Sequence, residues 1–234
     1  MTQHNPPLRL IVYTALLGGY DLPRPAPVGE TSEIETRFLC FTDGSAGSGW
    51  EQIRCDATDT LDARIRRARY FKTQPHKVLP THDVSIWIDA NLELTTSPLL
   101  LLDALGISDI ATFAYPSTYG ERDCIYQEAA ACVERGKDDP MVIERHIARY
   151  RTEGYPCHSG LVETSIVVRR NNASSQVFND CWWAEIVGGS RRDQLSFNYV
   201  AWVLNQPYSL LAGSRQWNPY AKYYSHLVKV YGGG

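Results

Sequence analysis

The chain has 234 residues, of which 44% are hydrophobic, and a formal net charge of −3. This size and apolar content favour one α/β domain over two small ones, and the slight acidity does not favour an extended nucleic acid as a partner. We expect neither a signal peptide nor a membrane span, because no charged and apolar leader and no run of about 20 apolar residues is visible. The six cysteines form no CxxC pair, which favours reduced thiols and a cytoplasmic protein over a zinc site.

Strand and helix patterns alternate along the first half of the chain. Apolar runs bounded by turn residues predict strands over 8–17, 36–43, 49–56, 83–89 and 109–116. Apolar residues at helical spacing predict a helix over 59–74, capped by Asp59 or Thr60 and ended by Pro75, and a short helix over 97–106.

The second half is more helical. Its patterns predict one late strand over 161–172 and helices over 123–136, 139–154, 174–189 and 192–206. Strands that alternate with helices indicate a mainly parallel central sheet flanked by helices, here as a single domain over 1–234. In such open sheets, ligands bind beyond the carboxyl ends of the strands.

The commonest nucleotide and hydrolase motifs are absent from the sequence. The first strand is not followed by GxGxxG, and there is no GxxxxGK[ST] loop, so neither a Rossmann dinucleotide site nor a P-loop is supported. GxSxG and HExxH are missing as well. A nucleotide site without a glycine fingerprint remains open.

The stretch SIWIDAN suggests a metal site at the end of the 83–89 strand. Asp89 and Asn91 are two residues apart in an extended segment, so both side chains can point the same way. Mg²⁺ or Mn²⁺ prefers such oxygen ligands and shares them with substrate phosphates. A strand that simply ends in a turn would carry the same residue types, and this alternative stays open.

The 59–74 helix is rich in cations, namely Arg64, Arg66, Arg67, Arg69 and Lys72. Arg69 and Lys72 lie three residues apart on one face and are the preferred pair for binding a diphosphate. His76 is a third candidate contact to the cofactor, although a lone histidine more often supports a loop. A solvated helix face would explain the same run of cations.

Further polar residues lie near predicted element starts in the second half. Asp193 and Gln194 in GSRRDQLSF would present polar groups to a sugar at the start of a helix. In the alternative, Ser190 caps that helix and Asp193 only favours its dipole. Glu163, just inside the 161–172 strand, could bind an acceptor hydroxyl or act as a base.

The C-terminal stretch YYSHLVKVYGG contains two more candidates. His226 could supply a third metal ligand and Lys229 a phosphate contact if this segment closes over the site.

Several of these stretches together resemble a known family from about residue 9 to about residue 205. It is a glycosyltransferase-like family with plant mucilage-related and turgor-regulation proteins and bacterial members. The likeness rests on YTALLGGYD, FLCFTD, RRARYFKTQPHKVLP, SIWIDAN, GLVETSIVVRRNN and SRRDQLSFNYVAW, in this order.

That family is similar to the GT-A class of nucleotide-sugar transferases, in which an Asp-x-Asp binds Mn²⁺ and the donor diphosphate. The resemblance implies this role for Asp89 and Asn91, with one negative charge fewer because Asn stands in the third place. It further implies that Asp193 and Gln194 lie beside the donor sugar, as in retaining glycogenin-like enzymes, and that His226 completes the metal shell.

The resemblance also implies that Tyr13, Thr14 and Tyr20 lie near the nucleotide base. The predicted activity is transfer of a sugar from a nucleotide-diphosphate donor, a UDP-sugar, to a carbohydrate or other hydroxyl acceptor, with Mn²⁺ or Mg²⁺ and with retention favoured. Inversion would require Glu163 or Asp193 as a base. Two alternatives stay open: a metal-dependent amide hydrolase, because a plant relative has been linked to ceramide hydrolysis, and a glycan- or nucleotide-binding module without turnover.

Overall fold

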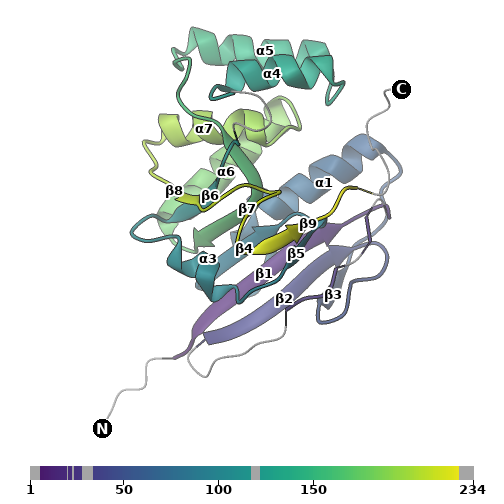
Figure 1. The fold of residues 1–234 in the computed structure, drawn as a ribbon. Coiled ribbons are helices and arrows are strands. Elements are labelled where there is room, and N and C mark those ends of the chain that lie inside the picture. Colours follow the sequence, from purple (N-terminus) through teal and green to yellow (C-terminus); the bar gives the residue numbers. More distant parts are fainter. Residues whose placement is uncertain (1–5, 20, 23, 28–33, 117–121, 227–234) are drawn as a thin grey trace.

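A seven-stranded sheet forms the centre of the molecule in the computed structural model, which describes residues 6–19, 21–22, 24–27, 34–116 and 122–226 (Figure 1). The strand order is β3-β2-β1-β4-β7-β6-β8. The strands are β1 (Leu8–Leu16), β2 (Ile34–Thr42), β3 (Glu51–Arg54), β4 (Val84–Ile88), β6 (Ile110–Ala114), β7 (Val162–Arg170) and β8 (Ser209–Leu211).

One strand of this sheet is antiparallel to the others. β1 pairs in parallel with β2 and β4, β2 with β3, and β6 with β8, whereas β7 is antiparallel to both β4 and β6. The start of β7 therefore lies at the same edge as the carboxyl ends of β4 and β6. The backbone N–H of Asp89, just beyond β4, donates to the carbonyl of Ser165 at 2.8 Å. The predicted α/β fold with a mainly parallel sheet is confirmed.

Six of the helices described here begin and end close to the predicted boundaries, and the short helix α2 (Pro75–Val78) was not predicted. The six are α1 (Leu61–Thr73), α3 (Leu99–Asp103), α4 (Ile125–Glu134), α5 (Pro140–Thr152), α6 (Ala173–Gly188) and α7 (Gln194–Val203). Thr60 caps α1 by accepting from the N–H of Ala63 at 3.2 Å, and Asp139 caps α5. Pro75 begins the short helix α2 directly after α1, because its missing N–H is tolerated at a first helical position.

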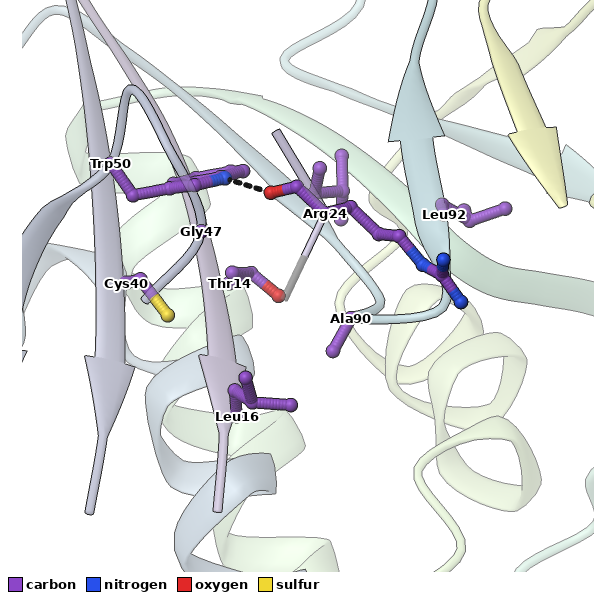
Figure 2. A pocket seen from close by; sticks show the side chains of 9 residues that line it. Thr14, Leu16, Arg24, Cys40, Gly47, Trp50, Ala90 and Leu92 are labelled. Carbon is purple, nitrogen blue, oxygen red and sulfur yellow. Dashed lines mark hydrogen bonds between the residues drawn. The ribbon is translucent and has the colours of Figure 1, made fainter. Parts of the chain in front are cut away.

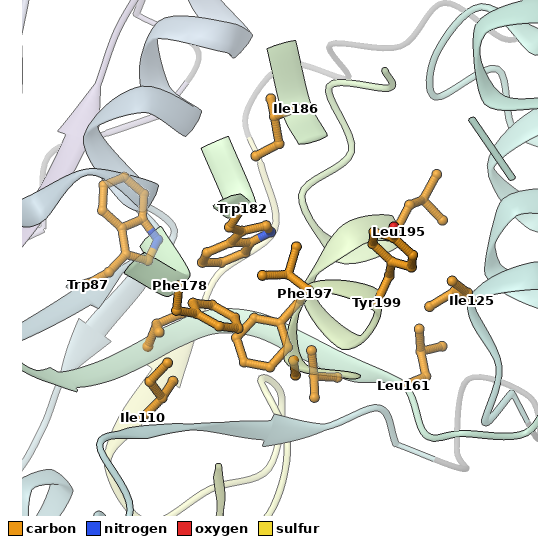
Figure 3. Close-up of a cluster of buried hydrophobic side chains, with 14 of the residues drawn as sticks. Trp87, Ile110, Ile125, Leu161, Phe178, Trp182, Ile186, Leu195, Phe197 and Tyr199 are labelled. Carbon is orange, nitrogen blue, oxygen red and sulfur yellow. The ribbon is translucent and has the colours of Figure 1, made fainter. Parts of the chain in front are cut away.

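The core lies on both faces of the sheet. On one face, Phe178 and Trp182 of α6 and Phe197 of α7 pack edge to face above β7 (Figure 3). The indole N–H of Trp182 donates to the carbonyl of Asp193 at 2.9 Å, so this core fixes the backbone at the start of α7. A second cluster, which includes Val12 of β1, covers the other face.

Three short strands were not predicted, namely β5 (Leu92–Leu94), β8 and β9 (Ala221–Tyr223). β5 and β9 form a separate antiparallel pair, and the N–H of Tyr224 just beyond β9 donates to the carbonyl of Asn91 at 2.9 Å. The pairing brings the C-terminal part of the chain to the Asp89–Asn91 turn. Within the described ranges, no helix is both long and apolar enough to cross a membrane.

Candidate active site

A buried lysine connects four elements at the carboxyl edge of the sheet. The Lys72 ammonium lies 2.6 Å from Asp193 Oδ2 and 3.5 Å from Asp89 Oδ1. It also donates to Thr164 Oγ1 at 3.0 Å. The lysine is 1% exposed. The end of α1, the end of β4, the start of β7 and the start of α7 therefore meet at one positive charge.

Asp193 is the best-compensated charge of the site. Arg69 Nε lies 3.0 Å from Asp193 Oδ1, and Thr164 donates to Oδ2 at 2.8 Å. Burial raises the pKa of Asp193, but Arg69 and Lys72 outweigh it and hold that pKa well below 3.8. The Asp193 carboxylate is therefore ionised, oriented and a poor proton acceptor at neutral pH.

The structure corrects one expectation about the start of α7. Asp193 occupies the N-cap position but makes no side-chain cap bond, because its carboxylate faces the two cations. Ser190 does not cap α7 either: its hydroxyl donates to Asp138 Oδ2 at 2.7 Å. The Nε2 of Gln194 is buried and has no hydrogen-bond partner among the described residues, so it can donate to a ligand.

A buried arginine holds the end of α1 in place. Arg169 of β7 donates to the carbonyl of Lys72 at 2.6 Å and to the hydroxyl of Tyr13 at 2.5 Å. The Tyr13 hydroxyl also donates to the Lys72 carbonyl, at 3.0 Å. Tyr13 thus lies under α1 in the core, and it is its neighbour Thr14, on the opposite face of β1, that lines a pocket. Arg169 was not among the predicted site residues, although a cation within an apolar strand was a signal.

Asp89 and Asn91 keep oxygen atoms available for a cation. Asp89 is partly exposed, and the described residues donate only to its Oδ1, from the indole N–H of Trp87 at 2.8 Å and from Lys72. Asn91 donates from Nδ2 to the carbonyl of Tyr224 at 3.1 Å, which fixes the orientation of its amide. Its Oδ1 is buried and accepts no hydrogen bond from any described residue. Both oxygens therefore fit the ligand preferences of Mg²⁺ or Mn²⁺.

His226 lies next to a buried carboxylate. Its Nδ1 is 2.8 Å from Asp21 Oδ2. In a metal-binding histidine one ring nitrogen commonly contacts a carboxylate while the other binds the metal, so Nε2 would be the ligand atom. Within the part of the chain described here, no three His, Cys, Asp or Glu side chains form a metal-binding group, so a cation would depend on the Asn91 amide and on substrate oxygens. Lys229 and Tyr20 lie outside the described residues.

Glu163 lies beside this cluster at the start of β7. Its Oε1 is 3.2 Å from Arg215 Nε, and its Oε2 accepts from the backbone N–H of Arg215 at 3.2 Å. Burial raises the pKa of Glu163; Arg215 opposes the increase and the Asp89 charge adds to it. Glu163 is thus better suited than Asp193 to exchange a proton.

A small pocket lies next to the Asp89–Asn91 turn. Figure 2 shows Thr14, Arg24, Trp50 and Ala90 around it, with the indole N–H of Trp50 donating to the carbonyl of Arg24 at 2.7 Å. The Arg24 guanidinium lies 3.7 Å from the ring centre of Tyr224. Arg24 was not among the predicted site residues because it lies in a proline-rich loop without periodicity.

His76 lies apart from these contacts. Its Nε2 is 3.3 Å from Asp180 Oδ1, and its Nδ1 lies 3.4 Å from Asn179 Nδ2, both on α6. His76 therefore joins α2 to α6, in agreement with the alternative of a supporting histidine.

A mainly parallel sheet with one reversed strand, an Asp-x-Asn turn after β4 and a buried Asp-Gln pair at the start of α7 together form a GT-A-like α/β domain. The chain belongs to the TOD1/MUCI70 glycosyltransferase-like domain family, whose sequence profile matches residues 48–214. That match includes Lys72, Asp89 and Asp193 but neither Thr14 nor His226.

The chain is also similar in sequence to two proteins from Arabidopsis thaliana. The chain is 30% identical to "Probable hexosyltransferase MUCI70" over 215 residues, which cover 82% of this chain and 37% of that protein. It is 26% identical to "Alkaline ceramidase TOD1" over 137 residues, which cover 53% of this chain and 29% of that protein. The chain thus matches well under half the length of either relative.

Proposed function

We propose that this domain transfers a hexose from a nucleotide-diphosphate donor, a UDP-sugar, to a hydroxyl group of an acceptor, with the help of Mn²⁺ or Mg²⁺. The observation that carries the proposal is the buried Lys72–Asp193 ion pair beside Asp89 at the carboxyl edge of the sheet. The name of the hexosyltransferase relative supports the same class of reaction.

The donor diphosphate would lie at the Asp89–Asn91 turn. Asp89 Oδ2, Asn91 Oδ1 and His226 Nε2 are the protein atoms that would hold the cation. The bound cation would stabilise the negative charge of the leaving diphosphate. The adjoining pocket with Thr14 and Arg24 has a volume of about 10 Å³, which is too small to enclose a nucleoside, so the nucleoside part of the donor would lie over its opening. Thr14 Oγ1 is buried there without a hydrogen-bond partner among the described residues.

The donor sugar would lie against the start of α7. The ionised Asp193 would stabilise positive charge that develops at the anomeric carbon, and Gln194 Nε2 would donate to a sugar hydroxyl. Lys72 and Arg69 contact Asp193 and would orient it, and Lys72 also approaches Asp89. Their contact with the donor phosphate stays a prediction.

We propose retention of configuration. Both oxygens of Asp193 are engaged and its pKa is lowered, so it is unsuited to deprotonating an acceptor. If the reaction instead inverts, Glu163 is the base, because its carboxyl lies at the same edge and burial raises its pKa.

A thermal shift measurement with a panel of nucleoside diphosphates, with and without Mn²⁺, tests the donor site. A ligand that binds only the folded protein raises its Tm by mass action, so we expect an increase with UDP that requires Mn²⁺. NMR of the glycoside formed from the matching donor then gives the configuration. An increase with another nucleotide would change the donor. No increase with any nucleotide would contradict the proposal.

The second candidate is hydrolysis of an amide, which rests on the name of the ceramidase relative. Asp89 and His226 would then hold a metal, and that metal would supply an activated water for hydrolysis of the amide. Turnover of a ceramide without any nucleotide sugar, lost in Asp89→Ala, would favour this reaction over sugar transfer.

A further inference from the structure

The loop after β8 lies at the same edge of the sheet as the candidate active site. β8 pairs in parallel with β6, and Phe113 of β6 is paired with Glu163 of β7. The chain that leaves β8 at Leu211 therefore emerges beside Glu163, and Arg215 in this loop contacts both oxygens of the Glu163 carboxylate. We call residues 213–218 the Arg215 loop.

The Arg215 loop is held in one conformation by its own backbone. The N–H of Ser214 donates to the carbonyl of Trp217 at 2.8 Å, and the N–H of Trp217 donates back to Ser214 at 3.2 Å. Asn218 Nδ2 donates to the carbonyl of Ser214 at 2.8 Å. Gly213 has φ +85°, and a Cβ there would lie 2.1 Å from the Trp217 carbonyl oxygen, so the tight turn requires glycine.

This ordered loop places one side chain inward and leaves another in solvent. The Arg215 side chain lies between Glu163 and the ring of Tyr223, 4.9 Å from the ring centre. Trp217 is 76% exposed, whereas Trp87 and Trp182 are 2% and 0% exposed. Leaving a large side chain in water forgoes about 1.5–3 kcal/mol of burial energy. A hydrogen-bonded loop that keeps an indole in water two residues from Arg215, which contacts Glu163, fits a binding surface better than a packing role.

We propose that Trp217 is the stacking surface for a pyranose ring of a carbohydrate acceptor, with Arg215 beside it next to Glu163. This inference rests on the proposed sugar transfer. A pyranose presents an apolar C–H face, which packs on an aromatic ring, and a rim of hydroxyls, which hydrogen-bond to cationic and carboxylate groups. The Arg215 loop offers both kinds of contact, and the adjoining Glu163 would bind the accepting hydroxyl.

The test compares Trp217→Ala with Trp202→Ala, which removes an exposed tryptophan of α7. Trp202 is 44% exposed. The probes are cello-, manno-, xylo- and galacturono-oligosaccharides, titrated against the whole chain by calorimetry and by tryptophan fluorescence. We expect the wild type and Trp202→Ala to bind at least one of them alike, and Trp217→Ala to bind it about tenfold more weakly. Trp217→Phe should retain part of the affinity.

Donor binding separates this inference from the proposed function. We expect Trp217→Ala to keep the wild-type Tm and the wild-type shift with nucleotide and Mn²⁺, because the Trp217 side chain is 76% exposed whereas Lys72 and Asp193 are buried. Equal oligosaccharide affinities in Trp217→Ala and Trp202→Ala would overturn the inference. So would a wild type that binds nucleotide but none of the probes. A wild type that binds no nucleotide would remove the proposed function and this inference together.

Discussion

Replacing either member of the Lys72–Asp193 pair should destabilise the protein strongly and unequally. The two residues are 1% and 2% exposed, and their charged atoms are 2.6 Å apart. Removing one partner of a buried pair costs about 3–5 kcal/mol, because an uncompensated charge remains. Asp193→Asn leaves both Lys72 and Arg69 without their shared carboxylate, whereas Lys72→Met leaves Asp193 paired with Arg69. We therefore expect the larger loss from Asp193→Asn.

Urea unfolding of both variants and of Lys72→Met/Asp193→Asn at pH 7 measures the coupling. The double variant should lose less than the sum of the single losses, by about 1–3 kcal/mol. Additivity to within about 0.5 kcal/mol, at unchanged m values, would refute the ion pair as described. Exposed pairs serve as the comparison: the same cycle on Arg37 and Glu51 should give no more than about 1 kcal/mol.

The pH dependence of the unfolding free energy gives an independent test of the lowered pKa of Asp193. The folded-state pKa lies well below the ordinary value of 3.8, so the stabilisation is fully present above pH 3.8. It declines as the pH falls below 3.8 towards the folded-state pKa. Asp193→Asn lacks this ionisation, so the gap in unfolding free energy between wild type and variant should narrow below pH 3.8. A constant gap down to pH 2 would contradict the lowered pKa.

Three further variants test other parts of the site. Asp89→Ala should abolish donor turnover and the Mn²⁺-dependent increase in Tm with nucleotide. It should lower the free energy of unfolding by only about 1 kcal/mol, since the Asp89 side chain is 27% exposed. Full activity of this variant would rule out a metal role for Asp89. Asn91→Asp should lower the Tm measured without metal, because a carboxylate would then face the Tyr224 carbonyl oxygen. The added carboxylate should also tighten Mn²⁺ binding. An unchanged Tm would contradict the amide contact. Gly189→Ala should lower the free energy of unfolding by about 1–3 kcal/mol and displace the segment that leads into α7, since its Cβ would lie 2.4 Å from the His146 ring. At Gly188, an added Cβ meets nothing within 4 Å, so Gly188→Ala should be neutral or stabilising. Equal effects of the two changes on Tm would refute the steric account.

The fold was largely predictable because local signals agreed with the tertiary structure. Helix caps such as Thr60 and Asp139 and the long apolar strand runs gave element boundaries to within a few residues. The strands β5, β8 and β9 were missed because three residues are too few to show alternation. β5 and β9 pair across a long stretch of sequence, and no local pattern reveals that pairing.

The candidate site was predictable in its residues but not in their partners. Polar side chains at the ends of strands identified Asp89, and helical spacing placed Lys72 and Arg69 on one face. Both cations pair with Asp193 because α1 and the start of α7 come together at the edge of the sheet. This tertiary contact cannot be predicted from residue spacing. One signal was available and unused: adjacent residues of a strand face opposite sides, so Tyr13 and Thr14 could not both line the same pocket.

The charges of the site lead to a final prediction about the order of binding. Lys72 and Arg69 already compensate Asp193, and Lys72 also lies 3.5 Å from Asp89. With Asn91 in place of a second carboxylate, the protein alone offers a cation little negative charge, so we expect Mn²⁺ to bind weakly to the free protein. A diphosphate would supply the missing negative oxygens. Mn²⁺ and UDP should therefore each increase the protein's affinity for the other by the same factor, which we expect to be about 5–150. Calorimetric titration of Mn²⁺ with and without UDP measures that factor. Equal Mn²⁺ affinity in the two titrations would show that the diphosphate does not complete the site and would refute the assignment of Asp89 and Asn91.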